Sequence, residues 1–180
     1  MRRRYVVIVL IGTLTAVVLN VLLYRQSDAI FSTLNELSES LKKKERERFE
    51  VQLFLTQLHK SNSVQQTFEN FQKSTFFVNR QQEITDPTLL DNWPEYHTLK
   101  QSNQTIDDLR ADFLHTVNRS GQASFAATDF VAWGGQAIRV LETHQQLQIT
   151  LRHYLKKLNE EQLLKVVSYN VVALLTLLIL

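Results

Sequence analysis

The chain has a long apolar run at each end and a more polar stretch between them. The first run, Tyr5 to Tyr24, contains 20 residues, and its polar members besides the two tyrosines are Thr13, Thr15 and Asn20. A helix of this length covers the roughly 30 Å hydrocarbon core of a bilayer. Tyrosine favours the headgroup region, where both ends of such a helix lie. The pattern therefore predicts that residues 1–24 form a cytoplasmic tip and a first transmembrane helix.

A cleaved signal peptide is the alternative interpretation of this run, because Arg2, Arg3 and Arg4 would serve as its basic start. The run is longer than the roughly 7 to 15 apolar residues of a signal peptide, and no A-x-A-like site follows it. We therefore favour an uncleaved span. Basic flanks stay in the cytoplasm, so the triple arginine places Arg25 and the residues after it on the outer side.

The second apolar run, VVSYNVVALLTLLIL, covers residues 166–180 and has 15 residues. A comfortable span needs roughly 20 residues, and no polar flank closes this one. We therefore expect the start of a second transmembrane helix that is truncated, with a cytoplasmic part missing. A complete protein that ends in a buried or interfacial helix is the alternative.

Residues 25–165 show a helical period, which is clearest directly after the first apolar run. Core positions recur there in steps of four and three: Ile30, Leu34, Leu37, Leu41, Lys44, Arg48, Val51, Leu55 and Leu58. Charge interrupts this a/d pattern at Lys44 and Arg48, and the pattern predicts that the first helix continues to about Lys60. The phase slips at Ser61-Asn62-Ser63, which indicates a turn.

A second helix is predicted from this turn to about Gln82. Its apolar series is Val64, Phe68, Phe71 and Val78. Asp86-Pro87 and Trp93-Pro94 then predict a connecting loop over residues 83–93, because proline lacks the helical donor and restricts the residue before it.

A third helix begins at Pro94, with Asn92 as a possible cap, and stops at residues 118–121. Its apolar side, thin between Leu99 and Ile106, consists of Tyr96, Leu99, Ile106, Leu109, Phe113 and Val117. A fourth helix begins near Ala123 and can run directly into the terminal apolar segment. Its stripe consists of Val140, His144, Leu147, Leu151, Tyr154 and Leu158.

The pattern as a whole predicts an all-α fold, an antiparallel four-helix bundle between two transmembrane helices. The 180 residues include only 4 glycines and 2 prolines, which suits long helices. The alternative is a two-helix hairpin with a kink at Ser61 and another near Gly121.

Charge and composition exclude several classes of function. Without Arg2 to Arg4, 17 basic residues remain against 18 acidic ones, a net charge of −1 for the outer domain. No clustered basic face is present, so we expect no nucleic-acid partner. The chain has no cysteine, which excludes disulfides, thiolate metal sites and cysteine nucleophiles.

The sequence also offers no catalytic or metal-binding constellation, and we expect no cofactor. The five histidines never occur at the i, i+3 or i, i+4 spacing that places two ligands on one helical face. His144 falls on the apolar stripe of the fourth helix, where a satisfied core histidine is the favoured interpretation. Asp107, Asp108 and Asp112 suggest a solvated face, and the mixed-sign run from Lys42 to Arg48 suggests exposed ion pairs.

Two groups of residues are candidates for ligand binding. The first lies around the loop between the second and third helices and consists of Arg80, Trp93, Tyr96 and His97. The second, on the fourth helix, consists of Phe130, Trp133, Gly134, Gly135 and Arg139. Two successive glycines within a helix suggest a kink or a close approach of another helix. For both groups, ordinary packing around a buried tryptophan is the alternative.

This arrangement resembles the sensor region of bacterial transmembrane receptors, namely sensor histidine kinases, chemoreceptors and membrane diguanylate cyclases. The resemblance rests on Arg2 to Arg4, the Tyr5 to Tyr24 span, an outer domain of about 140 residues and the returning apolar segment from Val166. It implies a homodimer in the bacterial inner membrane, with the central domain in the periplasm and a cytoplasmic kinase or cyclase beyond this segment. It also implies sensing of a small-molecule ligand or of a periplasmic partner, followed by transmembrane signal transduction. A structural, membrane-anchored tether without ligand sensing is the alternative function.

Overall fold

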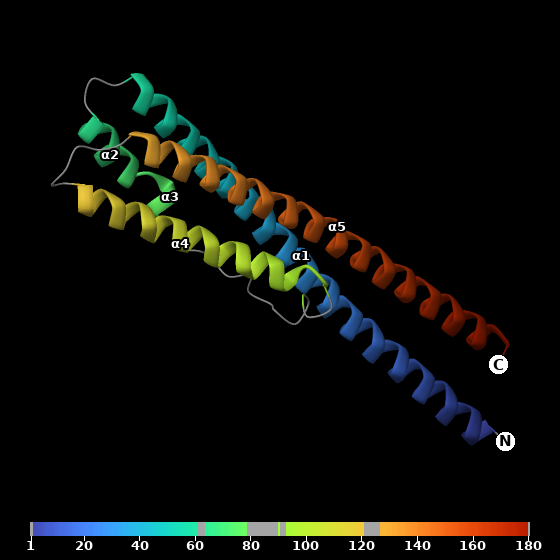
Figure 1. Cartoon of the computed structure of the whole chain (residues 1–180). Helices are drawn as coiled ribbons and strands as arrows, with labels where there is room; N and C mark the ends of the chain where they lie inside the picture. Colours follow the sequence, from blue (N-terminus) through green and yellow to red (C-terminus); the bar gives the residue numbers. More distant parts are fainter. Residues whose placement is uncertain (1, 61–63, 79–89, 91–92, 121–126, 180) are drawn as a thin grey trace. The chain divides into compact units, whose positions relative to one another are not determined.

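The computed structural model describes residues 2–60, 64–78, 90, 93–120 and 127–179. All regular secondary structure in this part of the chain is helical, which confirms the all-α prediction. In chain order the helices are α1 (Arg2–Lys60), α2 (Val64–Gln72), α3 (Thr75–Val78), α4 (Tyr96–Ser120) and α5 (Ala127–Ile179) (Figure 1).

The two longest helices, α1 and α5, are uninterrupted over 59 and 53 residues. Neither contains proline, and the only glycines in them are Gly12 in α1 and the pair Gly134 and Gly135 in α5. The predicted continuation of the first helix to Lys60 is therefore confirmed. The predicted run of the last helix into the terminal apolar segment is confirmed as well, because α5 reaches Ile179.

The second predicted helix is divided into α2 and α3. Between them, Ser74 N–H donates to the Phe71 carbonyl at 2.9 Å, a bond that tightens the turn, and the Ser74 carbonyl accepts from Phe77 N–H at 3.2 Å. This break shifts the phase of the apolar series. Phe76 is buried, whereas Val78 is 68% exposed, so the prediction that Val78 lies on the apolar side is wrong.

Helix α4 agrees with the predicted third helix at its end and nearly at its start, since it begins at Tyr96, two residues after Pro94. Leu99, Ile106 and Phe113 are buried as expected. Other sequence predictions lie outside the described residues: the cap at Asn92, most of the loop over 83–93, and the positions Ser61 and Gly121 at which the alternative hairpin would kink.

The predicted seam on α1 is correct at every second position and one residue too late at three of the other four; at the fourth, Leu41 is half-buried. Ile30, Leu37, Lys44, Val51 and Leu58 are buried as predicted. At three intervening positions the buried residues are Thr33, Glu47 and Phe54, where the sequence pattern selects the next residue. On α5 the shift has the opposite direction: Leu141, Gln148 and Leu155 are buried, each one residue after the predicted Val140, Leu147 and Tyr154. Each helix buries a face wider than a strict a/d seam, and polar residues occupy part of it.

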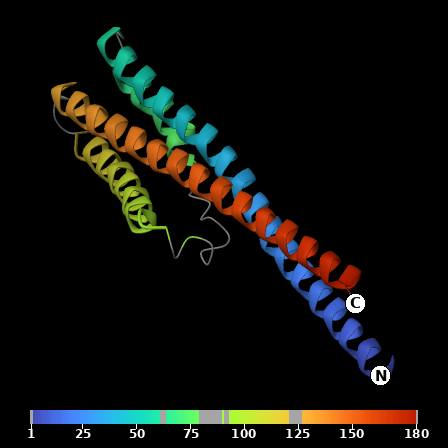
Figure 2. The ribbon, with the colours of Figure 1, turned by 90° about the vertical axis from the view of Figure 1, so that its right-hand side faces the viewer.

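The structure divides into two compact units. Unit 1 comprises Met1–Asn35 and Arg152–Leu180, and unit 2 comprises Glu36–Leu151. In unit 1, segments of α1 and α5 lie side by side, as both views of the ribbon show (Figures 1 and 2).

Among the described residues, α1 is the one helix that is long and apolar enough to cross a membrane, judged by length and composition. Its apolar side chains there, such as Leu10 and Leu14, are more than half exposed.

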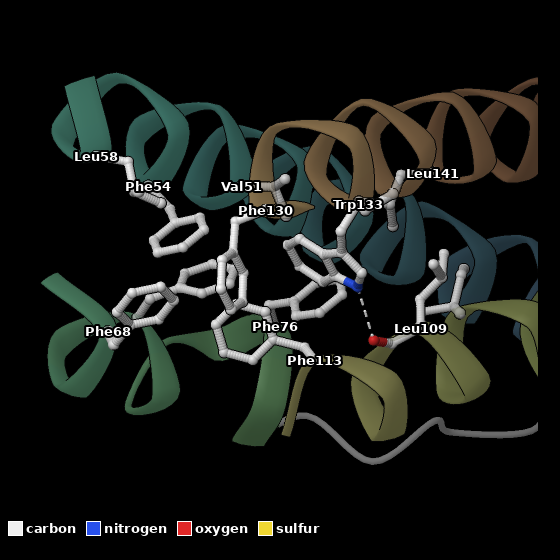
Figure 3. Packing of buried hydrophobic residues seen from close by; sticks show 13 residues of the cluster. Val51, Phe54, Leu58, Phe68, Phe76, Leu109, Phe113, Phe130, Trp133 and Leu141 are labelled. Carbon is white, nitrogen blue, oxygen red and sulfur yellow. Dashed lines mark hydrogen bonds between the residues drawn. The ribbon is translucent and has the colours of Figure 1, made fainter. Parts of the chain in front are cut away.

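Unit 2 has an aromatic core, called the aromatic cluster below. Its rings come from every helix: Phe54, Phe68, Phe71, Phe76, Phe77, Phe113, Phe130 and Trp133. Phe54 stacks on Phe71 with 4.3 Å between ring centroids. Phe113 lies beside Trp133 (Figure 3), and their ring centroids are 4.7 Å apart. Rings at these separations bury large apolar areas and add specific edge and face contacts. The cluster thus ties the short helices α2 and α3 to α1, α4 and α5.

Candidate functional site

The most unusual part of unit 2 is a connected set of polar side chains, most of them at positions that face the core, called the polar layer below. Its members are Ser40, Lys44 and Glu47 on α1, Ser102, Asp107 and Arg110 on α4, and His144 and Gln148 on α5. Lys44, Glu47, Arg110, His144 and Gln148 are all buried. Charged residues are rarely buried unless they are paired, so each member needs a partner.

Glu47 is the centre of the charged part of the layer. The same oxygen, Oε2, lies 3.0 Å from Lys44 Nζ and 3.2 Å from an Arg110 guanidinium nitrogen. The Glu47 side chain is only 2% exposed, so two cations from α1 and α4 converge on a carboxylate that water hardly reaches. Breaking such a pair leaves an uncompensated charge in the interior, which costs about 3–5 kcal/mol.

Arg110 on α4 connects this carboxylate of α1 to α3 and to a second carboxylate on its own helix. Its Nε donates to the backbone carbonyl of Phe76 at the short helix α3, and its guanidinium lies 5.0 Å from the centroid of the Phe76 ring. A second guanidinium nitrogen donates to Asp107 Oδ1 at 2.7 Å. The fork of arginine donors suits several acceptors at once, so this one side chain joins α1, α3 and α4.

Glu50, one turn after Glu47 on α1, holds the start of α3. Its Oε2 accepts from the Thr75 hydroxyl at 2.5 Å and from Phe76 N–H at 3.1 Å. The first N–H groups of a helix have no partner within the helix, and a carboxylate there also matches the positive end of the helix dipole. The position of Phe76 is therefore determined by Glu50 and Arg110 together.

Burial opposes the charges in this layer. It raises the pKa of the Glu47 carboxyl, and the nearby Lys44 and Arg110 cations act against that rise. Burial likewise lowers the pKa of the Lys44 ammonium, while Glu47 acts to raise it. Each group thus depends on its partner for its charge. A displacement of Lys44 from Glu47 favours the neutral form of both.

His144 provides the connection between α5 and α4. Its Nδ1 lies 2.7 Å from the Ser102 hydroxyl, and Ser102 itself donates to the Leu99 carbonyl at 2.7 Å. A hydroxyl has one proton, so His144 donates through Nδ1 and cannot remove the serine proton through that atom. Burial and the nearby Lys44 charge lower the pKa of His144 to about 3, which keeps the ring neutral. The pair is therefore structural, as the sequence analysis favoured for His144.

Gln148, one turn after His144, completes the layer. Its amide Nε2 donates to the Ser40 hydroxyl at 2.7 Å, whereas its Oε1 is buried and accepts no hydrogen bond from the described residues. Buried carbonyl groups nearly always have a partner. The Gln148 side-chain carbonyl is therefore an acceptor of the polar layer that has no donor among the described residues.

Among the described residues, no group of three His, Asp or Glu side chains is placed to hold a metal ion. Asp107 and Asp108 lie on the exposed side of α4, as expected, although Asp107 pairs with Arg110. The prediction that the run from Lys42 to Arg48 forms only exposed ion pairs is wrong, because Lys44 and Glu47 are buried.

The first predicted ligand group is only partly described. Trp93 is 3% exposed, and its backbone N–H donates to the Leu90 carbonyl at 2.9 Å just before α4. Tyr96 is half-buried and its ring lies 6.1 Å from that of the exposed His97. Arg80 lies outside the described residues. Two side chains of this group, Tyr96 and His97, are thus accessible to a ligand.

The second predicted group divides between core and surface. Phe130 and Trp133 belong to the aromatic cluster, and Trp133 Nε1 donates to the Leu109 carbonyl at 2.9 Å (Figure 3). At Gly134 the predicted close approach of another helix is confirmed, because a Cβ there would lie 2.5 Å from Leu55 Cδ2 on α1. A Cβ on Gly135 would contact nothing within 4 Å, and Arg139 is exposed.

The structure does not gather the two predicted groups into one site. Trp93 precedes the first residue of α4, whereas Trp133 contacts Leu109 and Phe113 about two thirds of the way along it. Sixteen residues of separation in sequence correspond to about 24 Å along a helix. Any ligand site built on either tryptophan is therefore separate from the other.

Sequence reasoning missed Glu47 and Arg110, which hold the polar layer together. Two signals pointed to this region. Lys44 stands at a core position of the α1 seam, and a buried lysine requires an acceptor, which the following turn supplies. The apolar stripe of the third helix is thin between Leu99 and Ile106, and Ser102 fills that gap as the partner of His144.

Comparisons of the chain with protein-family models, with curated proteins and with solved structures found no match. The geometry of unit 1 and of the polar layer is therefore the basis for the function.

Proposed function

We propose that this chain is the input region of a bacterial membrane receptor, in which an extracytoplasmic antiparallel four-helix bundle senses a ligand or partner and signals across the membrane. The four members of the bundle are α1, α2 together with α3, α4, and α5. The apolar ends of α1 and α5 are the two transmembrane helices, and the receptor acts as a homodimer in the inner membrane.

One observation carries this proposal: α1 and α5 each contain both an apolar, exposed segment and members of the polar layer within one unbroken helix. On α1, Leu14 is 63% exposed and Glu47 is 1% exposed, with no helix end between them. Packed helices move by about 1–2 Å between discrete arrangements in known switches. A movement that starts at the polar layer therefore needs no additional element to reach the membrane.

The polar layer also favours a receptor over a tether. A buried ion pair seldom stabilises a fold more than well-packed apolar residues of the same volume. A passive spacer gains little stability from Lys44, Glu47 and Arg110 in its core. A two-state device does gain from them, because an alternative packing that moves Arg110 away from Glu47 changes the charge balance of several helices at once.

We place the ligand or partner contacts on the accessible members of the two predicted groups, Tyr96, His97, Gly135 and Arg139. Trp93, Phe130 and Trp133 support them from the core. Arg139 is exposed and can pair with an anionic group, and Gly135 leaves space beside it. Binding there biases the bundle only through a difference in affinity between its two arrangements.

Labelling of a single cysteine tests the membrane arrangement. Gln101 on α4 is exposed, and the chain has no other cysteine, so Gln101→Cys introduces one accessible thiol. We expect a membrane-impermeant maleimide to label this thiol in cells whose outer membrane is permeable to the reagent and whose inner membrane is intact. Labelling that requires disruption of the inner membrane would place unit 2 in the cytoplasm and contradict the proposal.

A tether and a receptor differ in what a change in the polar layer does elsewhere. If the chain is a tether, neutralising Glu47 affects only the stability of unit 2. If it is a receptor input region, the same change alters the packing of α1 against α5 in unit 1. Disulfide formation between cysteines placed in unit 1 measures that packing directly, because the natural chain contributes no thiol.

A further inference from the structure

Two asparagines in the apolar segments bond to each other across the helices of unit 1. Asn20 on α1 donates from Nδ2 to Asn170 Oδ1 at 2.9 Å, and Asn170 Nδ2 donates to Asn20 Oδ1 at 3.1 Å. The bond is reciprocal, so each amide is donor and acceptor to the other. Asn20 Nδ2 also donates to the Ala16 carbonyl at 2.9 Å, which uses its second proton.

The threonines of these segments behave differently. The hydroxyls of Thr13, Thr15 and Thr176 each donate to a carbonyl four residues earlier in their own helix, at 2.7, 2.9 and 2.8 Å. These bonds lie within one helix, so they satisfy the hydroxyl at any position of the neighbouring helix. The asparagine pair, in contrast, is satisfied only when α1 and α5 hold one particular position relative to each other.

We propose that Asn20 and Asn170 form a clasp that sets the axial register of the apolar segments of α1 and α5. The remaining side chains there are mostly Val, Leu and Ala, which pack acceptably in several registers, whereas a slide by one turn, 5.4 Å, separates the two amides. In an apolar environment a separated amide has no water to replace its partner. A buried asparagine fixes register in coiled coils for the same reason.

Cysteines at half-buried positions near the clasp can report this register through disulfide formation. Ala16 lies four residues before Asn20, and Ala173 lies three residues after Asn170. The two helices are antiparallel, so both steps lead in the same direction along the pair. Ala16 and Ala173 are both half-buried and small, so their Cβ atoms suit the close approach that a disulfide needs.

The test uses the full chain in bacterial membranes with Ala16→Cys and Ala173→Cys introduced together. Mild oxidation should form an intrachain disulfide, measured as the fraction of thiols protected from alkylation. Adding Asn20→Leu and Asn170→Leu should lower the rate of this disulfide by roughly threefold or more, since interhelical polar bonds in membranes contribute modestly. The same two leucine substitutions should also raise the disulfide yield for Ala16→Cys combined with Val166→Cys. That pair reports a register displaced by seven residues toward the N-terminal end of α5.

Thr13→Val is the matched control, because it removes a polar side chain that bonds only within its own helix. It should leave the Ala16→Cys and Ala173→Cys disulfide unchanged. The clasp is refuted if the double leucine variant crosslinks at the parental rate and register. It is also refuted if Thr13→Val slows crosslinking equally, or if the disulfide joins two chains instead of one. None of these outcomes depends on whether the chain is a receptor or a tether.

Discussion

The aromatic cluster and the polar layer follow one another along the same helices of unit 2, yet they are built from opposite chemistry. On α1, Phe54 contacts four other aromatic rings, while Glu47, two turns earlier, contacts two cations. On α5, Trp133 belongs to the first region and His144 to the second. Both regions are buried, so burial alone does not distinguish them.

The difference lies in how each region responds to displacement. Aromatic rings keep most of their burial when they shift slightly, because apolar burial has no preferred direction and each dispersion contact is weak. The polar layer depends on bonds of defined length and direction, and loss of one partner leaves a buried group unsatisfied. The cluster therefore supplies stability, and the layer makes one arrangement of α1, α4 and α5 distinct from its neighbours.

The largest expected effect is the loss of a ring from the aromatic cluster. Phe54→Ala should reduce the free energy of unfolding by about 3–5 kcal/mol, because it leaves a cavity among four rings. Phe49→Ala is the matched control on the same helix, since Phe49 is 62% exposed, and it should change stability by less than about 0.5 kcal/mol. Denaturant unfolding of the full chain in detergent micelles, followed by circular dichroism, measures both. Equal effects would contradict the cluster as the source of stability.

Neutralising the carboxylate of the polar layer should have a similar but smaller effect. Glu47→Gln leaves Lys44 and Arg110 without their anion and should cost about 3 kcal/mol, whereas Glu142→Gln, in an exposed pair with Arg48, should cost at most about 1 kcal/mol. The apolar triple variant Lys44→Met, Glu47→Leu and Arg110→Met should recover the parental stability or exceed it. A triple variant less stable than Glu47→Gln alone would show that the charges themselves stabilise the fold.

The third effect is a pH dependence from His144. Its pKa is about 3 in the folded state and about 6.5 when unfolded, so the unfolded chain binds the proton first as the pH falls. The stability contribution is complete above pH 6.5 and is lost toward pH 3, by about 2 kcal/mol between pH 7 and pH 5. His144→Gln removes this dependence, so the difference between parent and variant should follow that slope. A difference that is flat from pH 7 to pH 5 would mean that His144 is accessible to protons when folded.

The smallest effect compares two adjacent glycines beside the aromatic cluster. Gly135→Ala should stabilise α5 by about 0.5–1 kcal/mol, because alanine favours helix and the new methyl group meets open space. Gly134→Ala should lose that gain, because its methyl group displaces the Leu55 side chain. Thermal unfolding should therefore rank Gly135→Ala above Gly134→Ala by about 1 kcal/mol. The reverse order would contradict the close approach of α1 at Gly134.

Hydrophobic periodicity predicted the long helices well and the polar layer poorly, for the same physical reason. A search for apolar residues at steps of three and four selected Leu55 and Leu147, because leucine is expected inside. The residues actually buried beside them are Phe54 and Gln148. A pattern based on hydrophobicity cannot select Glu47, since a carboxylate enters a core only when a distant residue such as Arg110 pairs with it. That pairing is invisible without the fold.

The division of α2 from α3 illustrates a second limit. The sequence from Val64 to Val78 has no proline or glycine, so the strongest helix-breaking residues do not mark the break at Ser74. Glu50, 24 residues before Ser74, caps the new helix start and stabilises the break. In contrast, the stop of α4 at Ser120 was predictable, because Gly121 directly follows it.

The proposed function requires that the polar layer and the apolar segments are coupled through α1 and α5. The most direct measurement is the rate of disulfide formation in membranes between Ala16→Cys and Ala173→Cys, with Glu47→Gln or its control Glu142→Gln added. We predict that Glu47→Gln changes this rate by about fivefold or more, the lower end of usual coupling between sites, and that Glu142→Gln leaves it unchanged. Equal rates in all three chains, with unit 2 still resistant to proteolysis, would contradict the coupling and favour a tether.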